Sequence, residues 1–285
     1  MTLKSTQRTR KALKAHLKKA IAVLQPPPRL SVSEWADQER RLDSTSSAEP
    51  GRWYTARAEY QRGIMDACSD PSIKEVVVMA GAQLGKTETI LNIVGYHLDY
   101  DPCPILVLQP TLEMAQAFSK DRLASGLIKS TPAIRGKVKD PRSRDSNNTT
   151  LHKVFPGGAI TIVGANSPAG LASRPIRLVL CDEVDRYPTS AGSEGDPIQL
   201  ARKRSATFWN RKIVTVSTPT NKDDSRIEDA FKKSDQRHYY VPCRHCGEPQ
   251  RLSWQNVQWT DGDPDTACYV CEHCGSMWDD SDRSY

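Results

Sequence analysis

The chain has 285 residues, of which 38% are hydrophobic and 26% are charged, a composition typical of a folded globular protein rather than a disordered one. No apolar run approaches the roughly 20 residues that span a bilayer, and the basic N-terminus lacks the apolar core of a secretory signal. The sequence therefore argues against an integral membrane protein and against a secreted one, and we expect no membrane partner.

The net charge of +6 arises from an N-terminal arm. Residues 1–33 contain eight basic and no acidic side chains, so the rest of the chain carries a net charge of −2. Apolar residues recur at helical spacing within residues 4–24, and Pro26-Pro27-Pro28 follow, which predicts a basic helix and a stiff spacer over residues 1–28. Such an arm suits a polyanion or an acidic partner, although a solvated helix face has the same composition.

Short apolar segments alternate with helical patterns from residue 73 onward. Buried strands are predicted at residues 73–80, 105–108, 178–181 and 213–216, and helices at residues 86–98 and 111–123. A hairpin is predicted around Pro156-Gly157-Gly158, residues 31–70 are predicted to be mainly helical, and the polar residues 130–150 to form a surface loop. Strands separated by helices predict an α/β fold with a mostly parallel sheet and flanking helices.

A phosphate-binding signature follows the first of these strands. Residues 80–87 read Ala-Gly-Ala-Gln-Leu-Gly-Lys-Thr, which matches the P-loop pattern except that alanine replaces its first glycine. Backbone N–H groups at the start of the next helix would face an anion, Lys86 would reach the β- and γ-phosphates of ATP, and the Thr87 hydroxyl would bind Mg²⁺. The residues expected to bind the nucleotide are Ala80, Gly81, Gln83, Gly85, Lys86 and Thr87.

Two acidic residues end the strand at residues 178–181. Asp182 is expected to hold the Mg²⁺ of the bound nucleotide. Glu183 points the other way, because side chains alternate along a strand, and is expected to act as a general base toward the attacking water. A solvated strand end looks the same, but a position about 95 residues after a P-loop favours the catalytic interpretation.

The strand at residues 213–216 ends in Ser217-Thr218-Pro219-Thr220. Hydroxyl groups at the carboxyl edge of a parallel strand face the ligand crevice of such folds. Ser217 and Thr218 are therefore candidates for sensing the γ-phosphate and passing its state to a moving element. A turn or a helix cap is the alternative interpretation of the same residues.

The cysteines form a separate pattern near the C-terminus, where five of the eight lie between residues 243 and 274. Two matching C-x-x-C-G knuckles supply four thiolates, Cys243, Cys246, Cys271 and Cys274, which is the closed tetrahedral ligand set of structural zinc. The 24 residues between the knuckles leave room for a β-hairpin, expected through residues 254–259. Residues 239–285 are therefore predicted to be a small zinc-ribbon-like unit.

Other residues near the knuckles are weaker candidates. Cys268 could pair with Cys271, but the glycine that follows each knuckle favours leaving Cys268 spare. His245 and His273 lie inside the knuckles and are not expected to be ligands. Redox chemistry is the alternative, and it would call for a single knuckle near a thioredoxin-like unit. A DNA contact by Arg244 and Arg251 is a further hypothesis.

Taken together, residues 80–87, Gln109-Pro110-Thr111, residues 164–188 and Ser217-Thr218-Pro219 resemble the ATPase of the large subunit of tailed-phage terminases, the lambda-like GpA class. The resemblance covers roughly residues 30–280 and implies a RecA- and helicase-like P-loop ATPase at residues 29–238. It further implies a motor that drives double-stranded DNA into an empty capsid in the host cytoplasm. Its implied partners are double-stranded DNA, a small terminase subunit and the capsid portal, and its active form a homo-oligomeric ring.

The resemblance also assigns roles to residues of this sequence. Gln61 falls where such motors place a glutamine that contacts adenine, and Ser217 with Thr218 corresponds to their coupling motif. The phosphate loop contains no arginine, so the cation that stabilises the γ-phosphate must come from elsewhere. Arg174 and Arg186, which flank the acidic strand, are candidates, as is an arginine of a neighbouring subunit.

Terminase large subunits also carry a nuclease domain, and no nuclease carboxylate cluster is visible in this sequence, where Asp279, Asp280 and Asp282 form only a short acidic run. We therefore expect the motor portion without the endonuclease activity of the family. Two alternatives stay open at this point. One is a helicase-type DNA translocase, and the other is a non-catalytic prophage remnant that binds DNA or a partner through its basic arm and zinc ribbon.

Overall fold

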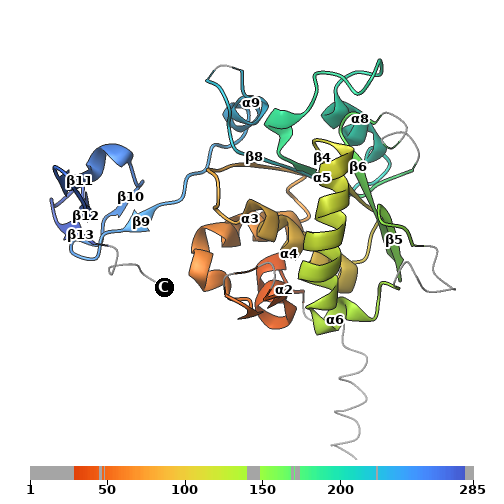
Figure 1. The fold of residues 1–285 in the computed structure, drawn as a ribbon, viewed down its shortest axis with the longest axis horizontal. Helices are drawn as coiled ribbons and strands as arrows, with labels where there is room; N and C mark the ends of the chain where they lie inside the picture. Colours follow the sequence, from red (N-terminus) through yellow and green to blue (C-terminus); the bar gives the residue numbers. More distant parts are fainter. Residues whose placement is uncertain are drawn as a thin grey trace, which may run out of the picture. The chain divides into compact units, whose positions relative to one another are not determined.

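The computed structural model describes residues 29–44, 47, 49–139, 148–167, 170, 174–222 and 224–279 (Figure 1). The basic helix expected at residues 4–24 lies outside these ranges. A compact unit begins at Ser31 and runs to the C-terminus, so the domain boundary expected after residue 238 stays a prediction. Within the described ranges, no helix combines the length and the apolar character needed to cross a bilayer.

The centre of the fold is a six-stranded sheet, which confirms the predicted mostly parallel α/β architecture. Its strand order is β3-β8-β7-β4-β6-β5, and only β5 runs antiparallel to its neighbour. The strands are β3 (Glu75–Met79), β4 (Ile105–Gln109), β5 (His152–Phe155), β6 (Gly158–Gly164), β7 (Leu178–Asp182) and β8 (Lys212–Ser217). All six lie where the sequence predicted strands: β3, β4, β7 and β8 from short, mainly apolar runs, and β5 and β6 from the hairpin signal between them.

Helices cover both faces of this sheet (Figure 1). The face formed by Ile105 and Val107 packs with the buried side of α4, and the opposite face, formed by Leu106 and Leu108, packs with residues of α8 and α9. The first layer contains α2 (Val32–Glu39), η1 (Thr55–Gln61), α3 (Arg62–Ser69), α4 (Lys86–Asp99), α5 (Leu112–Ala117), η2 (Phe118–Lys129) and α6 (Pro132–Arg135). The second contains η3 (Val184–Arg186), α8 (Pro197–Arg204) and α9 (Arg226–Lys232).

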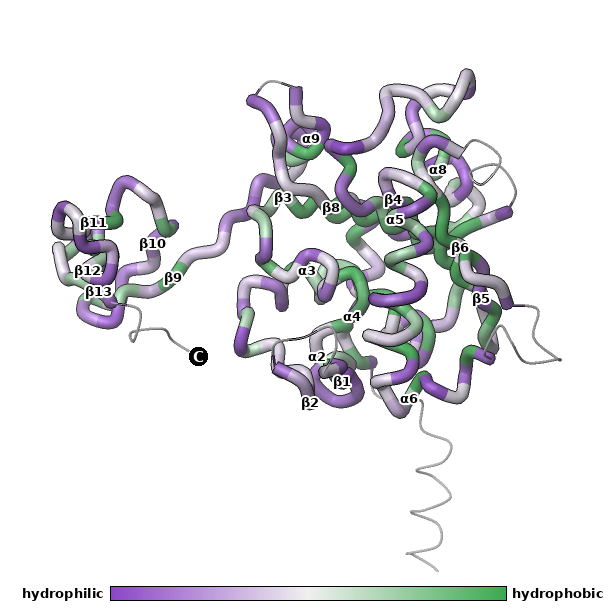
Figure 2. Tube along the Cα trace, viewed as in Figure 1, coloured by the Kyte–Doolittle hydropathy of each residue, from purple (hydrophilic) through white to green (hydrophobic). Residues whose placement is uncertain are grey.

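Hydrophobic residues concentrate along the central strands β8, β4 and β6 (Figure 2). Every residue of β4 and β7 is buried, as is typical of strands that are covered on both faces. The carboxyl ends of β3, β8, β7 and β4 consequently meet at one edge of the sheet, where open α/β sheets place their ligands.

Two expectations for the body of the fold need correction. The polar stretch at residues 130–150 is not only a loop, because α6 occupies Pro132–Arg135 and begins at a proline, whose fixed φ suits the first turn of a helix. Residues 31–70 are mainly helical as predicted, but they also contain a small antiparallel pair, β1 (Arg41–Leu42) and β2 (Gly51–Arg52).

The C-terminal segment forms short antiparallel sheets. Its elements are β9 (Val241–Pro242), β10 (Pro249–Gln250), η4 (Trp254–Asn256), β11 (Val257–Thr260), β12 (Asp263–Val270) and β13 (Met277–Trp278). The hairpin expected through residues 254–259 is therefore displaced. Its first strand begins only at Val257, after one turn of helix, and its turn contains Gly262 with φ +79°.

Candidate nucleotide site and cysteine cluster

The predicted phosphate loop connects edge strand β3 to the N-terminus of α4. Ala80 continues the sheet for one residue, since its N–H donates to the carbonyl of Ser217 at 3.2 Å. The loop then turns through Gln83 and Gly85, which have φ values of +61° and +70°. The positive φ of Gly85 favours glycine, and a Cβ atom there would lie 2.3 Å from Nε2 of Gln61 and would displace that amide.

Gln61 lies beneath this loop and is only 3% exposed. Its Nε2 donates to the carbonyl of Leu84 at 3.3 Å, and its Oε1 accepts from the Thr89 hydroxyl at 3.1 Å. The Tyr60 hydroxyl donates to the same carbonyl at 3.2 Å. Gln61 thus supports the loop from η1, and the adenine contact implied by the resemblance stays a prediction.

Lys86 connects the phosphate loop to the end of β8. Its ammonium donates to the carbonyl of Gly81 at 2.8 Å and to the hydroxyl of Thr218 at 2.7 Å, and the residue is 9% exposed. The structure therefore brings together two residues that are 132 positions apart and that the sequence singled out separately. Thr87 follows in the first turn of α4 and is half-buried.

Asp182 ends strand β7, which is separated from β3 by β8 alone. Asp182 is 5% exposed, and its Oδ2 accepts a hydrogen bond from Nε2 of Gln109 at 3.0 Å. Its Oδ1 is buried without a hydrogen-bond partner in the described part of the chain. Burial raises the pKa of Asp182 to about 6, while the hydrogen bond from Gln109 acts in the opposite direction.

Glu183 adopts a left-handed backbone conformation with φ +55° and ψ +49°, which is uncommon for a residue with a side chain. This geometry turns the chain abruptly from β7 into η3. The carboxylate lies 3.8 Å from Nε of Arg186, the candidate arginine that is exposed beside it. Non-glycine residues held in this conformation are found preferentially at functional sites, and the role of general base expected of Glu183 stays a prediction.

Ser217 is fully buried and joins the β8 end to the acidic segment. Its hydroxyl accepts from the N–H of Asp185 at 3.3 Å and donates to the carbonyl of Thr218 at 3.0 Å. The Asp185 carboxylate in turn accepts from the N–H of Thr220 at 3.0 Å and from that of Ile227, at the start of α9, at 2.8 Å. Burial alone would raise the pKa of Asp185. The hydrogen bonds that its carboxylate accepts outweigh this effect and hold the pKa below its ordinary value.

The two candidate arginines lie in different surroundings. Arg186 is next to Glu183, whereas Arg174 contacts Nε2 of His152 on β5 at 3.1 Å. Arg174 also lines a hollow of about 200 Å³ together with Leu106 and Ile176, on the strands' amino-terminal half. The contacts of Arg174 therefore give no support to a role at the phosphate loop.

Sequence reasoning missed Gln109 and Asp185 as members of this site. Gln109 belongs to a motif that carried the resemblance, and Asp185 lies three residues after Asp182, but neither position indicated a partner. The partners depend on strand order: β4 lies beside β7, and β8 lies on its other side.

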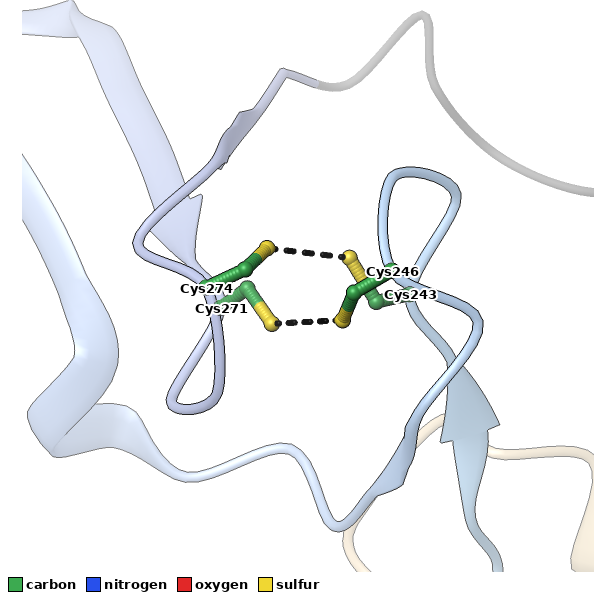
Figure 3. Close-up of side chains that lie close together, drawn as sticks. All are labelled: Cys243, Cys246, Cys271 and Cys274. Carbon is green, nitrogen blue, oxygen red and sulfur yellow. Dashed lines mark hydrogen bonds between the residues drawn. The ribbon is translucent and has the colours of Figure 1, made fainter.

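Four cysteine side chains converge in the C-terminal segment (Figure 3). The sulfur atoms of Cys243, Cys246, Cys271 and Cys274 all lie within 4.8 Å of one another. The two knuckles repeat one backbone turn, because the N–H of the glycine after each knuckle donates to the carbonyl of its first cysteine, at 2.8 and 2.9 Å. Both glycines have positive φ, +77° at Gly247 and +70° at Gly275, which accounts for glycine in the motif.

The three neighbouring residues considered in the sequence lie outside this cluster of four cysteines. Cys268 lies in β12 opposite Gln258 and is not a member of the cluster. His245 and His273 are likewise outside it, and the His273 ring lies 3.4 Å from the carboxylate of Glu272. Nε2 of Gln250 donates to the sulfur of Cys271 at 3.3 Å, a contact that supports a thiolate.

Fold and site together define an α/β protein. A phosphate-loop sequence connects its edge strand β3 to α4, and the acidic end of β7 lies at the same edge of the sheet. Comparison with known families then makes the assignment specific. The family described as phage terminase large subunit gpA, ATPase domain, matches residues 47–285, and the chain belongs to this family.

Curated relatives agree with this assignment. The terminase large subunit of Enterobacteria phage P21 is 29% identical over 266 residues, which are 90% of this chain and 41% of the relative. That of Escherichia phage lambda is 28% identical over 261 residues, which are 88% of this chain and 40% of the relative. The chain thus spans about two fifths of the length of these relatives.

Among solved structures, the large terminase of bacteriophage HK97 has the same fold. It superposes with a TM-score of 0.56 at 16% sequence identity, over 76% of this chain and 45% of the HK97 chain. At this identity the likeness concerns the fold alone, and it supports the mixed α/β architecture with a mostly parallel central sheet.

Proposed function

We propose that this chain is the ATPase motor portion of a phage terminase large subunit and hydrolyses ATP to move double-stranded viral DNA into a capsid. The observation that carries the proposal is the convergence of Lys86, Thr218 and Asp182 at the carboxyl edge of the sheet, in a chain of the terminase ATPase family. The remaining steps describe what the residues would do with ATP as substrate.

Substrate phosphates would bind the N–H groups at the start of α4 and the ammonium of Lys86. The present partners of Lys86 are oxygen atoms of Gly81 and Thr218, which occupy the positions that phosphate oxygens would take on the ammonium. Binding would therefore exchange one set of oxygen acceptors for another. The small residues Ala80, Gly81 and Gly85, together with Gln83, would let the backbone approach the phosphates.

Thr87 and Asp182 fit a magnesium ion. The unpartnered, buried Oδ1 of Asp182 is an oxygen ligand of the kind Mg²⁺ prefers, and the Thr87 hydroxyl follows the P-loop lysine as the motif requires. When bound, Mg²⁺ would neutralise charge that develops on the β- and γ-phosphate oxygens.

Glu183 would act as the general base. Its carboxylate would take a proton from the water whose oxygen attacks the γ-phosphorus, while the bond to the ADP oxygen breaks and inorganic phosphate leaves. Arg186, whose guanidinium lies 3.8 Å from this carboxylate, is the better placed of the two arginines to stabilise the transferring phosphoryl group. An arginine of a neighbouring subunit would serve equally in a ring.

Ser217 and Thr218 would couple the nucleotide to a moving element. A phosphate that draws Lys86 away would free the hydroxyl of Thr218, which directly follows Ser217. Ser217 and Thr220 both bond Asp185, and Asp185 bonds the N-terminus of α9. A shift of the β8 end would therefore reach α9 through hydrogen bonds present in this structure.

The four-cysteine cluster would bind zinc as a structural ion. Four sulfur atoms within 4.8 Å of one another provide the closed tetrahedral set, with no open position for a substrate.

The expected partners of the motor are double-stranded DNA, a small terminase subunit, the capsid portal and further copies in a ring, in the host cytoplasm. These partners rest on family membership and on the relatives, which are named as terminase large subunits. We propose no nuclease role for the described residues.

Steady-state ATP hydrolysis tests the proposal. The purified chain is assayed with and without double-stranded DNA, beside Glu183→Gln and Lys86→Ala. We expect hydrolysis that DNA stimulates. Glu183→Gln should keep nucleotide binding and lower kcat by roughly 100-fold or more, since a positioned base contributes about 10²–10⁴-fold. Lys86→Ala should lose both binding and hydrolysis.

The opposing outcomes are distinct. Hydrolysis by Glu183→Gln at the wild-type rate would exclude the base assignment. A wild-type chain that is folded but neither binds nor hydrolyses ATP would favour the non-catalytic remnant.

A further inference from the structure

Gln109 makes the one side-chain hydrogen bond that Asp182 receives in the described part of the chain. It ends strand β4, which pairs with β7, so the two residues occupy the carboxyl ends of adjacent parallel strands. Both are buried, at 3% and 5% exposure, and the distance from Nε2 to Oδ2 is 3.0 Å. A buried amide against a buried carboxylate is a costly arrangement unless each satisfies the other.

The strand end that carries Gln109 is firmly held. The hydroxyl of the buried Tyr187 donates to the carbonyl of Leu108 at 2.9 Å, and the N–H of Ala165 donates to the carbonyl of Gln109 at 2.8 Å. The carbonyl groups of Leu108 and Gln109 are thus tied to the residues that directly follow η3 and β6. A side chain that starts from so fixed a point has few alternative positions.

The chemistry of the pair determines which oxygen atom of Asp182 is available. An ionised carboxylate only accepts hydrogen bonds, so Gln109 must present its NH₂ group, since its carbonyl oxygen would face a second acceptor. That bond occupies Oδ2 and leaves Oδ1 without a partner in the described part of the chain. The two oxygens are therefore not equivalent before any ligand arrives.

We propose that Gln109 is a positioning residue that holds Asp182 by Oδ2, so that the carboxylate offers Oδ1 alone to the magnesium ion. The inference rests on the proposed function, because it assumes that Asp182 is a ligand of that ion. Gln109 acts through Asp182 and contacts neither the ion nor the substrate. Outer-shell partners of metal ligands typically contribute 10- to 100-fold to metal affinity, which sets the size of the expected effect.

The test measures metal affinity directly. Mn²⁺ replaces Mg²⁺, and free Mn²⁺ is quantified by electron paramagnetic resonance in the presence of a non-hydrolysable ATP analogue. Gln109→Met keeps the length of the side chain but cannot donate, and we expect it to weaken Mn²⁺ binding by about tenfold or more. Gln116→Met, the same change at an exposed position of α5, is the matched control and should match the wild type.

Two further readouts separate positioning from a general structural effect. Affinity for the analogue without any divalent ion should be unchanged in Gln109→Met, and excess Mg²⁺ should restore its kcat. Loss of metal-free nucleotide binding with normal stability, or Mn²⁺ affinity within twofold of the wild type, would overturn the proposal.

The wild-type chain provides a measurement that does not depend on the folding of a variant. In ¹⁵N-labelled protein, the side-chain NH₂ protons of Gln109 should exchange slowly with solvent, both before and after addition of Mg²⁺ and the analogue. Rapid exchange would show that the bond to Asp182 does not persist and would refute the inference. Slow exchange with no Mg²⁺-dependent nucleotide binding by the wild type would instead refute the proposed function.

Discussion

At the scale of single residues, the proposed nucleotide site contains charged groups that already have hydrogen-bond partners, although Oδ1 of Asp182 has none in the described part of the chain. Lys86 bonds Gly81 and Thr218, and Asp182 bonds Gln109. A buried ammonium or carboxylate is costly without such contacts. ATP would therefore replace the present hydrogen bonds of Lys86, while the bond from Gln109 to Asp182 would stay in place, and the Thr218 hydroxyl would respond to whether Lys86 contacts a phosphate.

His97, in the last turn of α4, gives a prediction for pH and stability. Burial lowers its pKa to about 4, and its Nδ1 lies 3.0 Å from the carbonyl of Asp101. In the unfolded chain the pKa of this histidine is near 6.5. Above that pH the imidazole is neutral in both states, and burying it carries no cost of removing a proton. This contribution to stability is lost as pH falls from about 6.5 toward 4 and is on the order of 3 kcal/mol at most.

We expect His97→Asn to flatten this part of the pH dependence, because the amide can still donate to the Asp101 carbonyl but does not titrate. Urea unfolding at pH 7 and at pH 4.5 measures the difference in free energy for both proteins. Carboxylates remote from residue 97 titrate equally in the two proteins and cancel in the comparison, whereas the carboxylate of Asp101, 3.5 Å from Nδ1 of His97, does not. An equal loss of stability in both proteins would contradict the assignment.

At the scale of elements, close helix packing depends on one glycine. Gly95 faces α2 from the middle of α4, and a Cβ atom there would lie 2.2 Å from the ring of Trp35. The Trp35 ring is 1% exposed and its Nε1 donates to Asp99 at 2.8 Å, so it has no room to retreat. We expect Gly95→Ala to destabilise the fold by about 1–3 kcal/mol, despite the better helix propensity of alanine.

Gly63→Ala in α3 is the matched control, because nothing lies within 4 Å of its Cβ position. This substitution should be neutral or stabilise by roughly 0.5–1 kcal/mol, since alanine loses less conformational freedom in a helix. Chemical denaturation of the two variants measures both effects. Equal behaviour of the two glycine variants would show that the α2–α4 contact is not tightly packed.

The sequence predicted elements more completely than it predicted contacts. Strands such as β4 and β7 are continuous apolar runs, so their location and burial follow from the pattern alone. The contact of Gln109 with Asp182 requires that β4 and β7 be neighbours, and residue patterns do not encode strand order. The same holds for Asp185, whose partners lie on β8 and α9.

Local chemistry explains the elements that prediction misplaced. Helix α6 is a single turn within a polar stretch, so it has no apolar periodicity to detect. In the C-terminal segment, the space between the knuckles predicts a hairpin through residues 254–259, but residues 254–256 form one helical turn and the strand begins at Val257. The cysteine cluster is predictable because each knuckle is a short local C-x-x-C-G pattern, and the positive φ of each glycine explains why glycine stands there.

At the scale of the whole molecule, the C-terminal segment lacks a large core of its own. Its described residues bury few apolar side chains, and Trp254, Trp259 and Met277 are 76%, 50% and 67% exposed. A unit of this size usually needs a metal or disulfides to fold, and the cysteines offer four thiolates at chelating distance. Metal binding should therefore contribute directly to the stability of this segment.

We expect one zinc ion per chain by elemental analysis and, after replacement by Co²⁺, the absorption bands of a tetrahedral thiolate site. Cys271→Ser should weaken metal binding and increase proteolysis of residues 239–279, whereas Cys268→Ser, which changes a cysteine outside the cluster, should retain the metal. The knuckles close only if both hold the same ion, since Cys243 faces Cys274 at 3.8 Å and Cys246 faces Cys271 at 3.9 Å. A metal-free chain whose C-terminal segment resists protease as well as the wild type would refute a structural role for zinc.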